Sequence, residues 1–286
     1  MASLLALSRA EQENAKAFLR WRLAAHFGTL LVSAAALFVR DPLSYALAVV
    51  AVLTELGAWA LRARSATLHQ LSERARRRGL LVEALGSRPN DLDAAQMETE
   101  FSARARRKAA RWDDPKYWAT QGDPLVKGPG LLRVNLQESA FWSSQLYRAA
   151  GRQAAVRLAA FVVALLAIAL ALLALDTGTV GQTVARVVAV VLAVVVSADE
   201  LGVMLAYFEG ARVAGQTVER LAHTDMADLG AALALFADYS TATSTAPPIP
   251  TAAYERKHDE IERAWSSASI RIEPENGADT QPSQVD

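Results

Sequence analysis

RLAAFVVALLAIALALLALD, residues 157–176, is the stretch that decides the fold class. Between Arg157 and Asp176 it has 18 consecutive apolar residues and no polar one. A helix needs roughly 20 such residues to cross the hydrocarbon core of a bilayer, and about 17 to 25 are tolerated. The alternative is a buried helix of a soluble bundle, but such a helix normally keeps a polar face. The stretch therefore predicts a transmembrane helix.

Three further segments are apolar over a similar length. In chain order the four predicted spans cover residues 23–39, 43–61, 158–175 and 187–208. Arg40, Asp41 and Pro42 join the first two, and a polar, glycine-containing turn that begins at Asp176 joins the last two. We therefore expect an all-α, polytopic membrane protein with two transmembrane helical hairpins, 23–61 and 158–208, and a helical cytoplasmic region.

The orientation follows from the basic residues. Of the 30 Lys and Arg, 28 lie before residue 23, between 62 and 157, or after 208, and only Arg40 and Arg186 lie in the two short turns. Cytoplasmic connections carry the excess of Lys and Arg. We expect both termini and the middle loop to face the cytoplasm. The strong preference for Arg over Lys is typical of a GC-rich bacterial genome, which points to a bacterial inner membrane.

The parts outside the spans are predicted to be mostly helical. They comprise an N-terminal segment 1–22, a helical cytoplasmic region 62–157, C-terminal helices 209–267 and a disordered tail 268–286 rich in Glu, Asp, Gln, Ser and Pro. The tail composition offers little apolar surface to bury. We expect it to add no packed structure.

Apolar spacing and turn residues divide these regions further. Predicted helices cover 66–85, capped by Gly86, and 91–111, with Met97, Phe101 and Ala105 on one stripe. Another runs from Leu131 into the third span. After the fourth span we expect one helix over 209–238, a polar linker over 240–245 and a short helix over 252–265.

Composition excludes several classes of protein. The chain has no Cys, so it has neither a disulfide framework nor a thiolate metal site. Its formal net charge is zero, so no global basic field points to polymeric nucleic acid. The four His form no metal-binding pair, and no G-x-S-x-G motif occurs. We expect no enzyme activity, no metal and no cofactor.

Three carboxylates fall inside or beside the predicted spans: Glu55, Asp199 and Glu200. A carboxylate at membrane depth costs on the order of 2.5 to 3.5 kcal/mol, so it normally faces a bundle interior or water. Counted by helical rise, Glu55 and Asp199 lie at similar depths, and we take all three as candidate pore-lining residues. The alternative is a fourth span shifted to residues 180–198, which puts Asp199 and Glu200 at the membrane edge.

Two basic clusters lie in the cytoplasmic region. They have three interpretations: a solvated or headgroup-facing helix surface, a phosphate site for a nucleotide or oligonucleotide, or a contact to polymeric nucleic acid. The residues are Arg76, Arg77, Arg78, Arg104, Arg106, Arg107 and Lys108.

An aromatic, proline-containing loop over 112–124, a helix after it and a proline-led C-terminal helix carry a family resemblance. The residues are Trp112, Trp118, Asn135, Gln137, Trp142, Tyr147, Pro250 and Tyr254. With the helix 66–85 directly after the second span, this layout resembles the SMODS-associated four-transmembrane pore-forming effectors of bacterial nucleotide-signalled defence. The chain departs from that pattern in having no Cys and in having Ser143, rather than an acid, after Trp142. Ordinary packing is the alternative for Trp142 and Tyr147.

The resemblance implies an oligomeric pore-forming effector of an anti-phage defence system. A cyclic nucleotide or oligonucleotide signal, or a partner protein, would gate it through the cytoplasmic helices. Because four helices are too few to enclose a wide channel, a pore needs several subunits. The alternative is a membrane-anchored signalling or scaffold protein without pore activity. A small transporter is less favoured, because the hairpins lack the Gly/Pro-broken helices of many such proteins.

Overall fold

The computed structural model describes residues 4–39, 42–86, 97–111, 127–174, 180–224 and 228–269, and these contain helices and no strand. The all-α prediction is confirmed. In chain order the helices are α1 (Leu4–Ala36), α2 (Leu43–Leu85), α4 (Ala103–Ala109), α5 (Pro129–Ala174), α6 (Val180–Ala222), α7 (Leu229–Thr245) and α8 (Thr251–Ser269).

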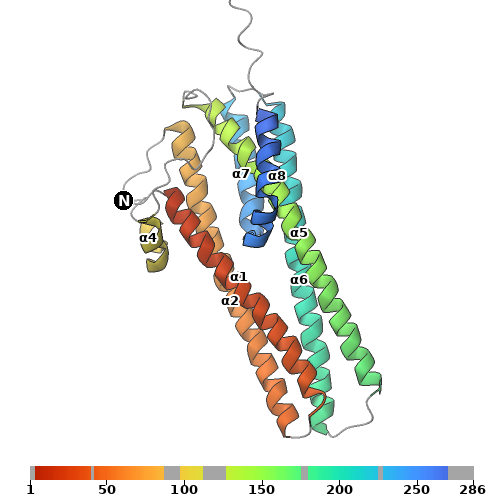
Figure 1. The fold of residues 1–286 in the computed structure, drawn as a ribbon. Coiled ribbons are helices and arrows are strands. Elements are labelled where there is room, and N and C mark those ends of the chain that lie inside the picture. Colours follow the sequence, from red (N-terminus) through yellow and green to blue (C-terminus); the bar gives the residue numbers. More distant parts are fainter. Residues whose placement is uncertain are drawn as a thin grey trace, which may run out of the picture.

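Four long helices form the body of the molecule. Figure 1 shows α1 beside α2 and α5 beside α6, with the C-terminal ends of α1 and α5 and the N-terminal ends of α2 and α6 at one end of the molecule, which we call the turn end. At the opposite end, the α7–α8 end, α7 lies between the two pairs, α8 lies against α5, and α4 lies against α1. At 1.5 Å per residue, a 43-residue helix such as α2 is about 65 Å long, twice the thickness of a bilayer core.

Three helices, α2, α5 and α6, are long and apolar enough to cross a membrane. The surface agrees, because 25 of the 28 exposed large apolar side chains among the described residues lie between Trp21 and Trp59 or between Val156 and Phe208. Soluble proteins rarely expose so continuous an apolar surface. Both findings indicate a membrane protein.

The first predicted span, residues 23–39, begins in α1, which is not among the three helices that are apolar enough to cross a membrane. Its buried face explains the difference, because it carries Arg22, His26, Thr29 and Ser33. Its outer face is apolar, with Phe27, Leu31 and Phe38 exposed.

The predicted helix over 66–85 is the second half of α2, without a break from the predicted second span. It ends as expected at Gly86, which has a φ of 68° and donates its N–H to the Val82 carbonyl at 3.0 Å. In the same way, α5 is continuous from Pro129 into the third predicted span.

The predicted single helix over 91–111 is wrong in its continuity; residues 91–96 lie outside the described part. Helix α4 begins only after Ser102, whose side chain accepts a hydrogen bond from the Ala105 N–H at 3.1 Å and so caps a new helix. The predicted stripe is present, because Met97, Phe101 and Ala105 are buried together against α1 and α2.

The C-terminal boundaries also differ from the prediction. Helix α6 continues to Ala222, and α7 covers the segment 240–245 that was predicted as a linker. Asp228 caps α7 by accepting from the Ala231 N–H at 2.9 Å. Thr241 and Thr245 donate to carbonyls of their own helix, so hydroxyl-rich composition does not interrupt it. The final helix agrees with the prediction, and the tail from residue 270 lies outside the described residues.

Candidate functional site: a buried ion network beside a cavity

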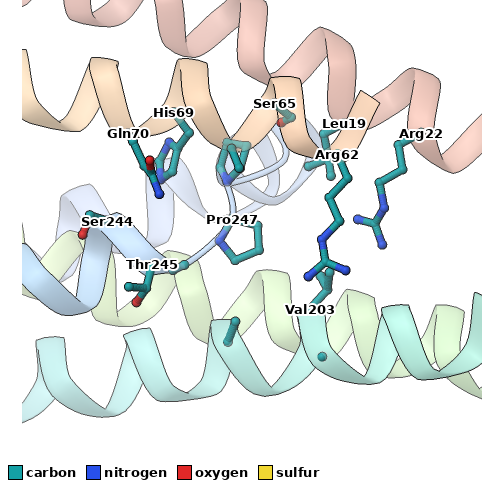
Figure 2. A pocket seen from close by; sticks show the side chains of 15 residues that line it. Leu19, Arg22, Arg62, Ser65, His69, Gln70, Val203, Ser244, Thr245 and Pro247 are labelled. Carbon is teal, nitrogen blue, oxygen red and sulfur yellow. The ribbon is translucent and has the colours of Figure 1, made fainter. Parts of the chain in front are cut away.

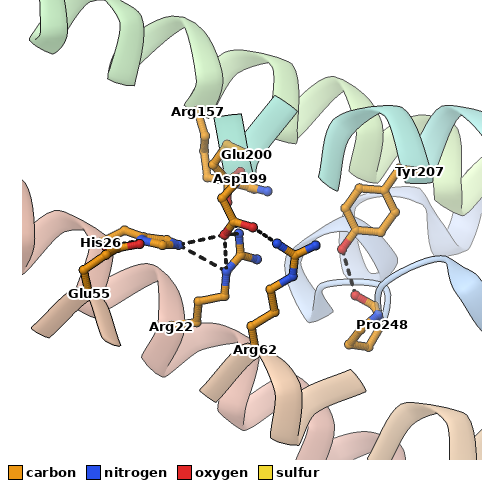
Figure 3. A network of polar contacts seen from close by, with 9 residues as sticks. All are labelled: Arg22, His26, Glu55, Arg62, Arg157, Asp199, Glu200, Tyr207 and Pro248. Carbon is orange, nitrogen blue, oxygen red and sulfur yellow. Dashed lines mark hydrogen bonds and ion pairs between the residues drawn. The ribbon is translucent and has the colours of Figure 1, made fainter. Parts of the chain in front are cut away.

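A cavity of about 130 Å³ lies between α2, α6 and the connection from α7 to α8. Figure 2 shows Arg22 and Arg62 at one end of it and His69 further along α2. Behind the two arginines lies a network of charged side chains that reaches into the middle of the bundle (Figure 3). Its members are Arg22 and His26 of α1, Glu55 and Arg62 of α2, Arg157 of α5, and Asp199 and Glu200 of α6.

Asp199 is the centre of the network. Its Oδ2 accepts from the Arg22 Nε at 3.0 Å, and the His26 Nε2 lies 3.1 Å from the same oxygen. The Arg22 Nη2 also pairs with Oδ2, and the Arg62 Nη1 pairs with Oδ1. The Asp199 side chain is only 5% exposed, whereas that of Arg62 is 53% exposed. Arg62 therefore links the buried carboxylate to the outside.

Glu200 extends the network to the second pair of helices. Its Oε1 lies 3.1 Å from the Arg22 Nη2, and its Oε2 accepts from the Arg157 Nε at 3.1 Å. Successive residues of a helix point about 100° apart, so neighbouring acids of α6 can contact different helices. All four long helices are thus joined by charged contacts at one level.

His26 lies between two carboxylates. Its Nδ1 is 3.0 Å from the Glu55 Oε2, and its Nε2 is close to both Asp199 and the Arg22 Nε, the latter at 3.2 Å. A neutral ring with the proton on Nδ1 donates to Glu55 and accepts from Arg22. A protonated ring donates to both carboxylates. With His26 neutral, three carboxylates balance three arginines; its protonation adds one positive charge.

Polar groups continue from the network toward the turn end along one face of α1. Arg22, His26, Thr29 and Ser33 follow one another at spacings of four, three and four, so they share a face, and all are buried. Unlike Ser197, which donates to the Ala193 carbonyl, the hydroxyls of Thr29 and Ser33 have no hydrogen-bond partner within the described ranges. This inward face of α1 is therefore polar for about 17 Å beyond the arginine, beside an apolar core that includes Leu30, Phe161 and Val196.

We compared the chain with known families, curated proteins and solved structures. No family model, curated protein or solved structure matches it. The function is therefore inferred from the side chains of this chain alone.

The structure brings the three predicted pore-lining acids together. Glu55, Asp199 and Glu200 share one layer, but each is buried and the ion pairs lie within one chain. Sequence reasoning missed the partners Arg22, His26 and Arg157. A detectable signal was the spacing of four between Arg22 and His26 at the start of an apolar run, which places two polar groups on one inward face.

The two basic clusters do not converge. Arg76 lies in the interface with α7, where its Nη2 donates to the Glu73 Oε2 at 2.8 Å and to the Tyr239 hydroxyl at 3.2 Å. Arg77 and Arg78 are half-buried. Burial lowers the pKa of Arg77, and Glu73 offsets part of that effect. The second cluster, Arg104, Arg106, Arg107 and Lys108, is exposed on α4.

Three of the eight family-like residues, Trp142, Tyr147 and Tyr254, pack α7 and α8 onto α5. The Trp142 ring lies 6.3 Å from that of Tyr254 and 5.5 Å from that of His258. Tyr147 is buried, and its hydroxyl donates to the Thr243 carbonyl at 3.3 Å. The Pro250 carbonyl accepts from the Ala253 N–H at the start of α8.

Of the other family-like residues, Asn135 and Gln137 are buried in α5. Trp112 and Trp118 lie outside the described residues. No group of three His, Asp or Glu arranged to hold a metal ion occurs within the described ranges.

One carboxyl outside the ion network has an altered pKa. Burial raises the pKa of Glu138 on α5 to about 7, and the nearby Glu262 and Glu83 act in the same direction. Its Oε2 is buried without a hydrogen-bond partner in the described part of the chain. Glu262 belongs to α8 and Glu83 to α2. Carboxyl groups of three helices therefore lie near one another where α8 packs onto α5.

Proposed function

We propose that the chain is a four-span protein of the bacterial inner membrane, with two transmembrane hairpins and both termini in the cytoplasm. Three apolar helices support this arrangement, and α1 lies along α2 with an apolar outer face. The charged face of α1 points into the bundle, so it does not oppose insertion. The distribution of Lys and Arg supports the orientation.

We place the cytoplasmic boundary of the membrane at the level of the network. Trp21 and Trp59 are exposed next to this level, and tryptophan is enriched at membrane interfaces. Arg62 is half-exposed there and reaches water. On this placement the fourth span runs from Val180 to Ala198, with Asp199 and Glu200 at its edge, and Glu55 lies about 10 Å deeper than Arg62.

The function we propose is that of a gated, oligomeric pore-former, and we take the arrangement described above as its closed form. The observation that carries the proposal is the buried ion network that joins all four long helices. A membrane anchor needs apolar helices only, and each buried charge is costly in a bilayer. An anchor therefore has no use for seven ionisable groups in its interior. A gate can use their ion pairs to hold the helices in the closed form.

Opening would exchange partners within the network. When the ion pairs between α1, α2 and α6 break, the helices are free to separate, and Glu55, Asp199 and Glu200 become available to line a shared path. Rings of acidic side chains favour cations. Several subunits are needed, because one bundle of four helices leaves no wide lumen. The helices at the α7–α8 end would bias the equilibrium between the two forms.

Expression in a bacterial host tests this function. We expect the chain, once activated, to abolish the membrane potential reported by a voltage-sensitive dye. Replacing Glu55 and Asp199 together by Leu should remove that effect at unchanged protein level. If the double variant remained fully active in its cellular role, the gated-pore proposal would be wrong.

The second candidate is a membrane-anchored signalling or scaffold protein. It is favoured by the pairing of every network acid within one chain, which also suits a permanently closed bundle. The exposed basic helix α4 would then serve as a docking surface. Loss of recruitment of a partner on removing Arg104 and Arg106, with unchanged membrane potential throughout, would identify this function.

The biological setting that we propose, anti-phage defence with a cyclic nucleotide or oligonucleotide signal, rests on the family resemblance alone. A neighbouring gene for a nucleotidyltransferase would support it. Liposomes that retain their dye with every candidate nucleotide would exclude nucleotide gating.

A further inference from the structure

The cavity beside the ion network has a wall of hydrogen-bond donors. The guanidinium groups of Arg22 and Arg62 lie at one end, and the imidazole of His69 and the amide of Gln70 follow along α2 (Figure 2). None of the residues that line the cavity is a carboxylate. The nearest negative groups are those of the network behind the arginines and the buried Glu73, which lies one turn beyond His69 and pairs with Arg76.

His69 is the least satisfied of these donors. It is 2% exposed, and neither ring nitrogen makes a hydrogen bond of normal geometry to the described residues, although the Thr243 carbonyl approaches the ring. Burial lowers the pKa of His69, so the ring is neutral at pH 7 and carries one N–H. A buried N–H whose hydrogen bond has poor geometry is costly, and a ligand in the cavity would satisfy it better than the Thr243 carbonyl does.

The opposite wall offers no competing donor or charge. Pro247 and Pro248 have no N–H, and the hydroxyl of Thr245 donates to the Ala242 carbonyl of its own helix. The Tyr207 hydroxyl donates to the Pro248 carbonyl at 2.9 Å and thereby fixes this wall to α6. A ligand in the cavity therefore contacts donors on one side and a shaped, uncharged surface on the other.

We infer that this cavity binds a phosphate group, supplied either by the head of an anionic phospholipid or by a soluble phosphate compound. Guanidinium forks match the geometry of phosphate oxygens, and a neutral imidazole and an amide add uncharged donors. A volume of about 130 Å³ admits one phosphate-sized group and leaves the rest of a larger ligand outside. The level of Trp21 and Trp59 is also where lipid phosphates lie.

Occupancy would act on the network through Arg62. This guanidinium pairs with Asp199 and also lines the cavity, so a bound phosphate competes with the carboxylate for the same donor. A phosphate that draws Arg62 away leaves Asp199 with fewer partners and weakens the link between α2 and α6. This regulatory role rests on the proposed gating function, whereas the binding site itself does not.

Binding is tested on the full chain, purified in a maltoside detergent, which contains no phosphorus. The first arm adds sodium phosphate, with sodium chloride at equal ionic strength as the reference, and follows the midpoint of thermal unfolding. The second arm adds dioleoylphosphatidylglycerol to the micelles, with dioleoylglycerol as the reference. At ten times the dissociation constant we expect the midpoint to rise by a few degrees, roughly 3 to 6 °C.

The variant Arg62→Gln should bind phosphate at least about tenfold more weakly, because it removes a charged donor. Arg62→Lys, which keeps the charge, should retain part of the response. Arg74→Gln is the matched control: Arg74 is an exposed residue of the same helix, and its ion pair is with Glu100, outside the cavity. Its response should equal that of the native chain.

A response in the first arm identifies a soluble phosphate ligand, and a response only in the second identifies a lipid headgroup. No shift in either arm, or an Arg62→Gln response equal to that of Arg74→Gln, overturns the inference. Because both arms measure binding in detergent, phosphate binding without any leakage in cells would leave the site in place and remove the gating function alone.

Discussion

The ion network in the middle of the molecule and the packing at the α7–α8 end hold helices together by different means. In the middle, a few charged side chains contribute most of the polar contacts, and Asp199 alone pairs with two arginines. At the α7–α8 end, many weak contacts share the task, such as the Trp142–Tyr254 ring pair and the hydroxyl bonds of Tyr239. A single substitution in the middle of the molecule should therefore lower the free energy of unfolding more than a single substitution at the α7–α8 end.

The largest effect is expected from Asp199→Asn. It leaves the buried Arg22 guanidinium with one acid fewer, and breaking a buried pair on one side costs about 3 to 5 kcal/mol. We expect a correspondingly lower free energy of unfolding in detergent. Glu209→Gln is the control, because Glu209 belongs to an exposed pair on the same helix. Equal stability of the two variants would contradict the ranking of the two regions.

The next effect concerns pH and Glu138. Its pKa is about 7 in the folded chain against 4.5 for a fully solvated glutamate, so folding favours the protonated carboxyl. The associated stability is fully present below about pH 4.5 and is lost as the pH rises through 7. Glu138→Gln should therefore stabilise the chain at pH 8, by about 2 kcal/mol after allowance for solvent, and by nearly nothing at pH 4.5.

Urea unfolding at the two pH values measures this difference. Glu255→Gln, an exposed change on α8, serves as the control and should be neutral at both. A Glu138→Gln variant that is no more stable at pH 8 than the native chain would show that α8 docks without a like-charge penalty.

A smaller effect is expected from Tyr239→Phe. The hydroxyl contacts Ser143 at 2.8 Å and receives a bond from Arg76 at 3.2 Å, but Arg76 keeps Glu73 as its partner. Loss of the hydroxyl should cost about 1 to 1.5 kcal/mol in a denaturant titration. A loss as large as that of Asp199→Asn would mean that the two regions do not differ in kind.

The smallest effect is expected from Tyr254→Leu. Tyr254 is 40% exposed, and its ring contacts Trp142 and His258. An aromatic pair contributes about 0.5 to 1.5 kcal/mol beyond the area that it buries, so we expect a loss near the lower value. Proteolysis should detect it as faster cleavage of α8 with α1 and α2 still protected. Global unfolding of this variant would be inconsistent with a locally docked helix.

The apolar helices and the proximity of the three acids could be predicted from the sequence. A run of 18 apolar residues without a polar one favours a transmembrane helix over a buried helix of a soluble bundle, and the constant rise of a helix places Glu55 and Asp199 at similar depths. The basic partners of the acids were missed because Lys and Arg at the ends of spans are also expected from the orientation of the protein in the membrane. Arg22 and Arg157 fit that explanation. A linear pattern does not distinguish an arginine that faces lipid headgroups from one that faces the bundle interior.

The boundary of α7 could not be predicted for a different reason. Six residues rich in Ser and Thr have the composition of a linker, yet within α7 their hydroxyls bond to carbonyls three or four residues earlier. Packing decides between the two structures, since Tyr239 and Thr243 are buried against other helices. Likewise, the two basic clusters look alike in sequence, and only the tertiary fold buries Arg76 and exposes Arg104.

Helix α2 has one more consequence. It runs unbroken from Leu43 to Leu85, contains no proline, and carries Glu55 and Arg62 in its middle and Arg76 beyond them. An unbroken α-helix is stiff in torsion because each turn is held by hydrogen bonds to the next. A rotation of α2 about its axis at the α7–α8 end would therefore carry Glu55 with it. The unbroken helix is a direct mechanical connection between the two ends of the molecule.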